Sequence, residues 1–307
     1  MTERRVYPIP DSFDGERIDL VLARITGMSR SSIARIIDEG QARLDGQQAV
    51  KSDVVTAGNV VEINLPAPRQ VEPIGGVEIP LLYEDQDVVV VDKPAGLAAH
   101  PSLNFEGPDV LGALQEAGIP VAKSGPPERH GIVHRLDVGT SGCMVVAKSE
   151  RAYSLLKREF HDRIPVKIYH AVVQGHPDPL SGTIDAPIKR DRRHQWKMAV
   201  QKGGRHAVTH YDTLEAMAGG TLVEVHLETG RTHQIRVHMS ALNHPCVGDE
   251  MYGADPVLAK KLGLERQWLH ATRLGFEHPD GTWREFTSQY PADLQGALDL
   301  MREGVFK

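Results

Sequence analysis

The sequence has few of the residues on which several classes of protein depend. It holds two cysteines, Cys143 and Cys246, too few for a disulfide framework or a zinc site of paired cysteines. Aromatic residues make up only 5% of the chain, which argues against a binding surface built mainly from stacked rings. Residues 1–14 lack the apolar core of a signal peptide, and the longest apolar run, residues 88–91, cannot span a bilayer. We expect a soluble, cytoplasmic protein without a membrane partner.

Positive charge is also scarce, since the formal net charge of the 307 residues is -6. This balance excludes indiscriminate phosphate binding, which relies on a broad basic field, but it leaves room for a local basic patch that binds RNA. The chain is longer than one typical domain, so we expect two domains.

The first 68 residues are expected to form a small domain of two helices and a sheet. The apolar spacing predicts a helix over residues 17–27 and a second helix from Ser29 to the stop signal at Gly40. The Asp-Gly pair at 45–46 indicates a hairpin turn, and residues 60–65 read as a strand.

A segment rich in proline and glycine, residues 69–79, is predicted to link this domain to a second one over residues 80–307. In the second domain we expect strands at residues 88–91, 143–147, 168–173, 208–214 and 221–227, and helices at 110–117, 150–160 and 232–242. Strands and helices are mixed without a regular alternation, which favours an α+β fold over a doubly wound parallel sheet.

The segment 134–142 concentrates polar side chains that can do chemistry. It places Asp137 in a loop punctuated by glycine, directly before an expected strand. A serine hydrolase elbow is excluded because Cys143 stands where its last glycine belongs. A kinase catalytic loop is excluded because Leu136 separates Asp137 from the His-Arg pair and Gly142 replaces the asparagine. Asp137 is therefore either a nucleophile or base, or a turn-capping residue.

The segment 227–238 leaves an expected strand at a glycine and enters an expected helix. Free backbone N–H groups at such a junction suit an anion. Arg231 stands there, where it could pair with a carboxylate through two hydrogen bonds or form a surface ion pair. His233 and His238 lie about 140° apart around a helix, and no His-Glu-x-x-His spacing occurs, so we expect no metal.

Tyr169 lies in the expected strand 168–173, on the face opposite to Ile168 and His170. A tyrosine in this position either packs in the core or faces a ligand. The sequence contains no phosphate loop and no dinucleotide fingerprint, so no cofactor is expected.

Taken together, these motifs closely resemble those of the RluA-type pseudouridine synthases. They occur in the family's order within residues 80–290, at residues 92–96, 134–137, 140–142, 169, 229–238, 244–245, 248–249, 252–253 and 269–271. The part from Arg17 to Gly58 resembles the small αL RNA-binding module first described in a ribosomal protein. The resemblance implies an αL domain followed by a catalytic domain with a mixed, largely antiparallel sheet.

The finer resemblance is to the RluD-like branch, which modifies uridines of helix 69 in 23S rRNA. Residues 194–200 and 207–211 are similar to that branch. The sequence departs from the commoner pattern at Val138-Gly139 and at Ala98-Ala99, which puts only the choice of substrate in doubt.

The resemblance implies a role for each candidate residue. Asp137 would start cleavage of the glycosidic bond, by adding to the sugar or by removing a sugar proton. Arg231 would hold Asp137 ionised and oriented, and Tyr169 would stack on the uracil and help remove the carbon-five proton. The residues expected to bind RNA are Arg30, Arg35, Lys51, His134 and Arg135; the first three could instead form a solvated helix face.

We therefore expect an enzyme that isomerises uridine to pseudouridine, acts as a monomer, and binds large-subunit rRNA or a ribosome assembly intermediate. Two alternatives stay open at this point. One is the same reaction at another rRNA site or in a tRNA. The other is an RNA-binding assembly protein without catalytic activity.

Overall fold

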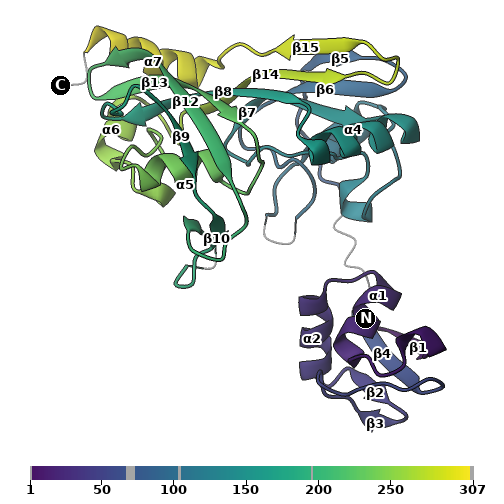
Figure 1. The fold of residues 1–307 in the computed structure, drawn as a ribbon. Coiled ribbons are helices and arrows are strands. Elements are labelled where there is room, and N and C mark those ends of the chain that lie inside the picture. Colours follow the sequence, from purple (N-terminus) through teal and green to yellow (C-terminus); the bar gives the residue numbers. More distant parts are fainter. Residues whose placement is uncertain (1, 67–72, 103–104, 195, 305–307) are drawn as a thin grey trace. The chain divides into compact units, whose positions relative to one another are not determined.

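A computed structural model describes residues 2–66, 73–102, 105–194 and 196–304 (Figure 1). The chain divides into two compact units, residues 1–70 and 71–307. Each unit has a hydrophobic core of its own.

The N-terminal unit combines a four-stranded antiparallel sheet with two short helices. Its elements are β1 (Thr2–Pro8), η1 (Asp11–Phe13), α1 (Ile18–Thr26), α2 (Arg30–Asp38), β2 (Ala42–Leu44), β3 (Gln47–Gln48) and β4 (Val60–Pro66). The strand order is β1-β4-β2-β3. Ser29 begins α2 by accepting a hydrogen bond from the backbone N–H of Ser32, and Gly27 ends α1 in the left-handed conformation. Isoleucines, leucines and valines of both helices fill the core against β4.

The second unit is built on a nine-stranded sheet. Its strands are β5 (Leu81–Glu84), β6 (Val88–Lys93), β7 (Ser141–Ala147), β8 (Val166–Gln174), β9 (Ser181–Asp185), β12 (Val208–Met217), β13 (Gly220–Leu227), β14 (Leu269–Glu277) and β15 (Trp283–Thr287). They follow the order β5-β6-β7-β14-β8-β13-β12-β9, with β15 paired to β14. All of these pairs are antiparallel except β7 with β14.

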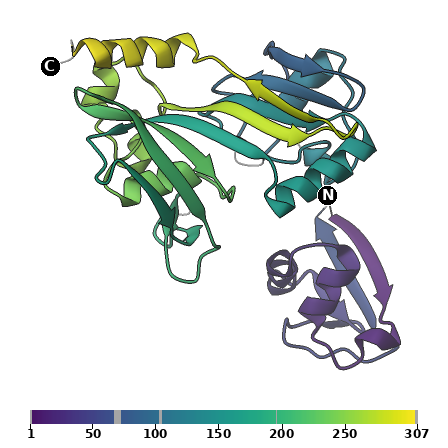
Figure 2. The same cartoon turned by 45° about the horizontal axis from the view of Figure 1, so that its top comes forward.

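The other elements of this unit pack around the sheet or connect its strands. The helices are α3 (Val110–Glu116), η2 (Pro127–Arg129), α4 (Glu150–Asp162), α5 (Gln234–Ala241), η3 (Glu250–Tyr252), α6 (Pro256–Lys261) and α7 (Ala292–Glu303). Strands β10 (Ile188–Arg190) and β11 (Met198–Val200) form a separate hairpin, which projects from the unit in Figure 1. In both Figure 1 and Figure 2, α7 (yellow) and α4 (teal) lie toward opposite ends of the unit.

The α+β class with a largely antiparallel sheet, predicted from the sequence, is confirmed, as is a small N-terminal domain with its own sheet. The sequence pattern did not predict the strands β1, β5, β9, β14 and β15, the hairpin β10–β11 or the helices α6 and α7; several of these strands are short or polar. Residues 67–72 lie outside the described residues, and with them the start of the predicted linker. Its later part belongs to the second unit, where the backbone N–H of Ile74 donates to the carboxylate of Asp109 and the Ile79 side chain is buried.

Gly142 allows the one parallel strand pairing in the sheet. It is paired with Ala271 of β14 and has a φ of 114°, a conformation that other residues rarely adopt. A Cβ atom at this position would lie 2.2 Å from the carbonyl oxygen of Ala271. The pairing fixes the start of β7, and therefore the loop that precedes it.

We predict that Gly142→Ala destabilises the second unit by about 3 kcal/mol or more, because it combines backbone strain with an overlap of atoms. Gly296→Ala is the matched control, since Gly296 lies within α7 and a Cβ there has open space around it. The control is expected to stabilise by about 0.5–1 kcal/mol. Urea unfolding followed by tryptophan fluorescence measures both, because Trp196, Trp268 and Trp283 all lie in the second unit. Equal effects of the two substitutions would contradict the prediction.

Candidate active site

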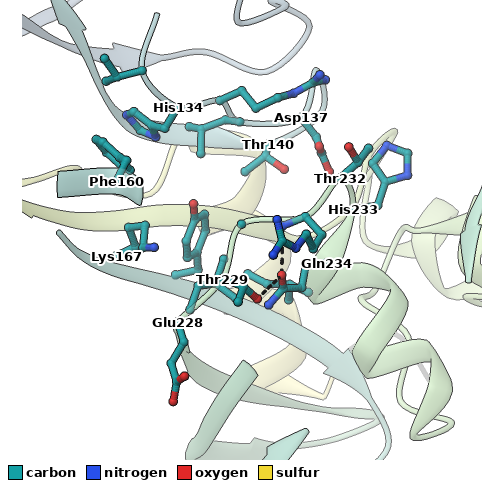
Figure 3. A pocket seen from close by; sticks show the side chains of 18 of the residues that line it. His134, Asp137, Thr140, Phe160, Lys167, Glu228, Thr229, Thr232, His233 and Gln234 are labelled. Carbon is teal, nitrogen blue, oxygen red and sulfur yellow. Dashed lines mark hydrogen bonds between the residues drawn. The ribbon is translucent and has the colours of Figure 1, made fainter. Parts of the chain in front are cut away.

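The second unit contains a pocket of about 530 Å³ lined by three of the predicted segments. The loop 132–137 forms one wall, β8 contributes Lys167 and Tyr169, and the segment 227–236 forms the other wall. Figure 3 shows side chains from these segments pointing toward one another around the open space. Residues far apart in the sequence therefore meet at one site.

The loop that carries Asp137 is held in place by hydrogen bonds to its backbone carbonyl oxygens. The fully buried ammonium group of Lys93 donates to the carbonyl oxygens of Val138 (3.3 Å) and Leu97 (2.7 Å). The backbone N–H of Gly96 also donates to Val138, and the Arg266 guanidinium donates to the next carbonyl of the loop. Burial lowers the pKa of Lys93 to about 7, and the charge of Asp137 opposes this shift.

Asp137 forms an ion pair with Arg236 of α5. The Nη1 atom of Arg236 lies 3.4 Å from Oδ2 of Asp137, while its Nε and Nη2 atoms donate to the two carboxylate oxygens of Asp249 at 2.6 and 2.8 Å. Burial would lower the pKa of Arg236, but the pair with Asp249 and the charge of Asp137 outweigh it and raise this pKa. The guanidinium is therefore a fixed positive charge beside Asp137.

Tyr252 supports this guanidinium from one side. Its ring lies 4.9 Å from the central carbon of the Arg236 guanidinium, within the range of a cation–π interaction. The Tyr252 hydroxyl is held at 2.7 Å from Nδ1 of His233 and accepts a hydrogen bond from the backbone N–H of Met198. Burial raises the pKa of Tyr252 to about 12, so the hydroxyl stays protonated at neutral pH.

The prediction that Arg231 pairs with Asp137 is wrong. The Nε atom of Arg231 donates instead to the backbone carbonyl of His206, and among the described residues Arg231 forms no ion pair. The reason is where α5 begins. Gln234 starts the helix and anchors the preceding turn to Thr229 through a hydrogen bond visible in Figure 3, so Arg231 stays in the turn while the helix directs Arg236 inward.

Tyr169 is buried and lines the pocket from β8. Burial, with smaller contributions from the charges of Asp137 and Cys143, raises the pKa of Tyr169. The Tyr169 hydroxyl makes no hydrogen bond within the described part of the chain. The ring is thus set in the core, and the polar group of this residue is left for a ligand.

His134 and Arg135, both predicted to bind RNA, differ in their surroundings. The His134 ring stacks on Phe160 at 4.5 Å, and its Nε2 atom accepts a hydrogen bond from the backbone N–H of Val145. Burial, aided by the charge of Lys167, lowers the pKa of His134 to about 3, so its imidazole is neutral at pH 7. Arg135 is exposed and lines the pocket.

A family model for RNA pseudouridylate synthases matches residues 87–241, the part of the chain that holds Asp137, Tyr169 and Arg236. An uncharacterized RNA pseudouridine synthase of Mycobacterium bovis is 58% identical over 302 residues, which cover 97% of this chain and 98% of that protein. The chain belongs to the RNA pseudouridylate synthase family. The family and the class of enzyme predicted from the motifs, an isomerase acting on RNA, are confirmed.

Two further comparisons, one with a named protein and one with a solved structure, also match this pseudouridine synthase. The ribosomal large subunit pseudouridine synthase D of Xanthomonas campestris is 41% identical over 313 residues, covering 96% of this chain and 92% of that protein. The solved structure of human RNA pseudouridylate synthase domain containing 4 has a TM-score of 0.57 and 28% identity, over 73% of this chain and 93% of that one.

The N-terminal cations predicted to bind RNA each have a carboxylate partner in the synthase. Arg30 donates to the buried carboxylate of Asp19 at 2.9 Å, and Lys51 lies 3.2 Å from Asp38. Arg35 lies 3.9 Å from Glu39 on the same helix. The unit of residues 1–70 holds nine Lys and Arg against ten Asp and Glu, so it is close to neutral.

A strongly basic segment of the synthase was not singled out from the sequence. Residues 189–205 contain seven Lys and Arg and a single acidic residue, Asp191. The segment includes the hairpin β10–β11, and its last arginine, Arg205, lines the pocket. A count of charge along the chain would have found it. Asp249 and Tyr252 lie in recognised motifs, but no local pattern predicts their contacts with Arg236.

In the ranges that the structure describes, no group of three or more His, Cys, Asp or Glu side chains is placed to hold a metal ion. Neither is any helix of those ranges long and apolar enough to cross a bilayer.

We predict that the free energy of unfolding of the synthase depends on pH through two histidines, His134 and His270. Burial lowers the pKa of His134 to about 3 and that of His270 to about 4, whereas an unfolded histidine titrates near 6.5. Below pH 6.5 the unfolded chain therefore binds protons that the folded chain does not. The free energy of unfolding should fall between pH 6.5 and 4, by up to about 1.4 kcal/mol per pH unit for each histidine.

Urea unfolding by tryptophan fluorescence at several pH values tests this, because it reports on the second unit and residues 1–70 contain no histidine. His134→Gln is the informative variant, since its amide oxygen can still accept from Val145 while it removes one titrating group. A slope in His134→Gln equal to that of the unaltered protein would show that His134 does not contribute.

Proposed function

We propose that this enzyme converts specific uridines of 23S rRNA to pseudouridine, with helix 69 of the large subunit as its target. The observation that carries the target is the similarity over nearly the whole chain to proteins named ribosomal large subunit pseudouridine synthase D, at 41% identity in Xanthomonas campestris and 38% in Pseudomonas aeruginosa. Such an rRNA target implies action in the cytoplasm, during ribosome assembly. The pocket is assembled by one chain, which supports a monomer.

The target nucleotide would leave the RNA stack to reach the pocket, because Asp137 lies within a concave site rather than on an open surface. In this proposal Asp137 starts cleavage of the bond between N1 of uracil and C1′ of ribose. Arg236 keeps Asp137 ionised and oriented, the role predicted from the sequence for Arg231. Asp249 holds Arg236 through two hydrogen bonds, so the charge beside Asp137 does not move during the reaction.

The reaction rearranges bonds without any net gain or loss of electrons. The N1–C1′ bond breaks, the uracil turns within the pocket, and a C5–C1′ bond forms. The proton on C5 is removed, and N1, no longer bonded to the sugar, takes up a proton. Because atoms and electrons balance within one nucleotide, the proposal includes no cofactor and no metal.

Tyr169 would stack on the uracil, and its hydroxyl would assist the proton transfer from C5. The raised pKa of Tyr169 means that this hydroxyl enters the reaction protonated. It would therefore donate a hydrogen bond to the ring first, and its own proton must move before it can accept the C5 proton. His134 and Arg135 would contact RNA at the pocket, and Arg30, Arg35 and Lys51 would add weaker contacts from the N-terminal unit, because each already has a carboxylate partner.

We predict that Asp137→Asn abolishes pseudouridine formation and preserves the fold and RNA binding. The change is isosteric, and Arg236 keeps its pair with Asp249. Pseudouridine is mapped in rRNA and tRNA from cells that lack the protein and from cells complemented with the unaltered chain or with Asp137→Asn. Helix 69 pseudouridines should return only with the unaltered chain. Asp212→Asn, an exposed carboxylate outside the pocket, is the matched control and should behave as the unaltered chain does.

The outcomes of this mapping separate the parts of the proposal. Pseudouridines that return in another rRNA helix or in tRNA would refute the helix 69 target and keep the activity. Complementation by Asp137→Asn would remove Asp137 from the chemistry. The absence of any difference between deletion and complemented cells would favour an assembly protein without catalytic activity.

We further predict that Tyr169→Phe binds RNA with nearly unchanged affinity and turns it over at least about tenfold more slowly. The phenyl ring keeps the stacking surface, whereas the hydroxyl, which has no partner within the described part of the protein, is lost. Single-turnover rates at saturating RNA, together with separately measured Kd values, test this. An unchanged rate would assign Tyr169 to packing alone.

A further inference from the structure

Four cationic side chains line one part of the pocket. Arg163 ends α4, Lys167 lies on β8, Arg205 follows the hairpin β10–β11, and Arg231 stands in the turn before α5. Figure 3 shows Lys167 on the side of the pocket opposite to Asp137 and His233. We call these four residues the cation cluster.

The cation cluster has little negative charge to balance it. Within the described part of the chain, Lys167, Arg205 and Arg231 form no ion pair, and Arg163 only approaches Glu228 at 4.0 Å. The Glu228 carboxylate is also bound by His210 at 2.8 Å. This differs from the N-terminal unit, where each of the three cations predicted to bind RNA has a carboxylate partner, although Arg30 shares Asp19 with Arg17.

These side chains also repel one another, which makes the arrangement unfavourable without an anion. Burial, and then the charges of Arg205 and Arg163, lowers the pKa of Arg231. Burial, and then the charge of Arg163, lowers the pKa of Lys167. A folded protein keeps unpaired, partly buried like charges together at a cost in stability, and an anionic ligand removes that cost.

We propose that the cation cluster binds a backbone phosphate of the RNA beside the nucleotide that enters the pocket. The arginines offer planar pairs of N–H donors that match phosphate oxygens. Lys167, on β8, adds a compact positive charge to the pocket wall. The carboxylate of Asp137 repels a phosphate, so the anion is favoured on the far side of the pocket, where Lys167 lies. The inference rests on the RNA substrate of the proposed function and not on the choice of helix 69.

This assigns Arg231 a role that its sequence motif did not reveal. Its backbone N–H donates to Gln234 and its Nε to the carbonyl of His206, which fixes the side chain without using its terminal nitrogens. Those nitrogens are left for the phosphate. Arg231 is then a binding residue at one side of the pocket, and Arg236 is the residue that acts on Asp137.

The first test measures the salt dependence of RNA binding for the full-length protein. The probe is a synthetic stem-loop with the helix 69 sequence or, if pseudouridine maps elsewhere, a stem-loop of the mapped sequence. Replacing both arginines in Arg205→Gln/Arg231→Gln should raise Kd roughly tenfold and lower the slope of log Kd against log salt by about 0.7 to 0.9, the loss of one phosphate contact. The exposed single variant Arg205→Gln should show part of the same loss and is the variant to use if the double variant does not fold.

The matched control is Arg158→Gln/Lys260→Gln, which removes two exposed positive charges outside the pocket. It should leave the slope within error of the unaltered protein. An equal loss of slope in the control would reduce the effect to overall charge and overturn the proposal. So would an unchanged slope in Arg205→Gln/Arg231→Gln or, if that variant does not fold, in Arg205→Gln.

The second test locates the phosphate. Uncharged methylphosphonate linkages are placed one at a time around the target uridine. The nucleotide that carries the substituted linkage has 2′-deoxyribose in both the charged and the uncharged RNA, so the two RNAs differ only in charge at that linkage. At one linkage, loss of charge should weaken binding of the unaltered protein roughly tenfold and binding of Arg205→Gln/Arg231→Gln less than about twofold. If the two losses add independently at every linkage around the target, the cation cluster does not hold a phosphate there.

Discussion

A guanidinium buried between two carboxylates is the interaction on which the site depends. Arg236 is 8% exposed and is held by Asp249, whose side chain is 1% exposed, while Asp137 is met by a single 3.4 Å contact. Removing one partner of such a buried pair typically costs about 3–5 kcal/mol, because a charge is left uncompensated. This difference between the two carboxylates fits the proposed role of Asp137. Asp249 holds the Arg236 guanidinium in place, whereas the Oδ1 atom of Asp137 accepts no hydrogen bond from the described residues.

The positions of Asp137, Arg236 and Asp249 depend in turn on the hydrophobic core packed against the sheet. Leu136, Tyr169 and Ile235 belong to one hydrophobic cluster, and each is either a site residue or next to one along the chain. The residues proposed to act on the substrate are therefore held by neighbours that cannot move without opening the core. Lys93 extends this support to the backbone, since its ammonium group bridges two loops through carbonyl oxygens and not through a carboxylate.

The sequence was sufficient for the fold class, the motif loops and the helices α1 to α5, because local periodicity and capping residues such as Ser29 decide them, but it did not predict α6 and α7. It was not sufficient to choose between Arg231 and Arg236. Both lie in one motif, and the choice depends on α5 beginning at Gln234, two residues later than the apolar spacing suggests. The hydrogen bonds of Gln234 to β12, like the pair of Arg236 with Asp249, join parts of the chain that no local pattern relates.

The placement of charge also bears on which unit holds the RNA. Cations that already have carboxylate partners must give them up to bind phosphate, and this exchange cancels much of the gain. Arg30 would have to leave the buried Asp19, which would then keep only Arg17. Within the described residues the cation cluster carries few such partners, and it belongs to the second unit, as does the basic segment 189–205. In a chain of net charge -6, the electrostatic part of RNA affinity is therefore expected to come mainly from the unit that carries out the reaction.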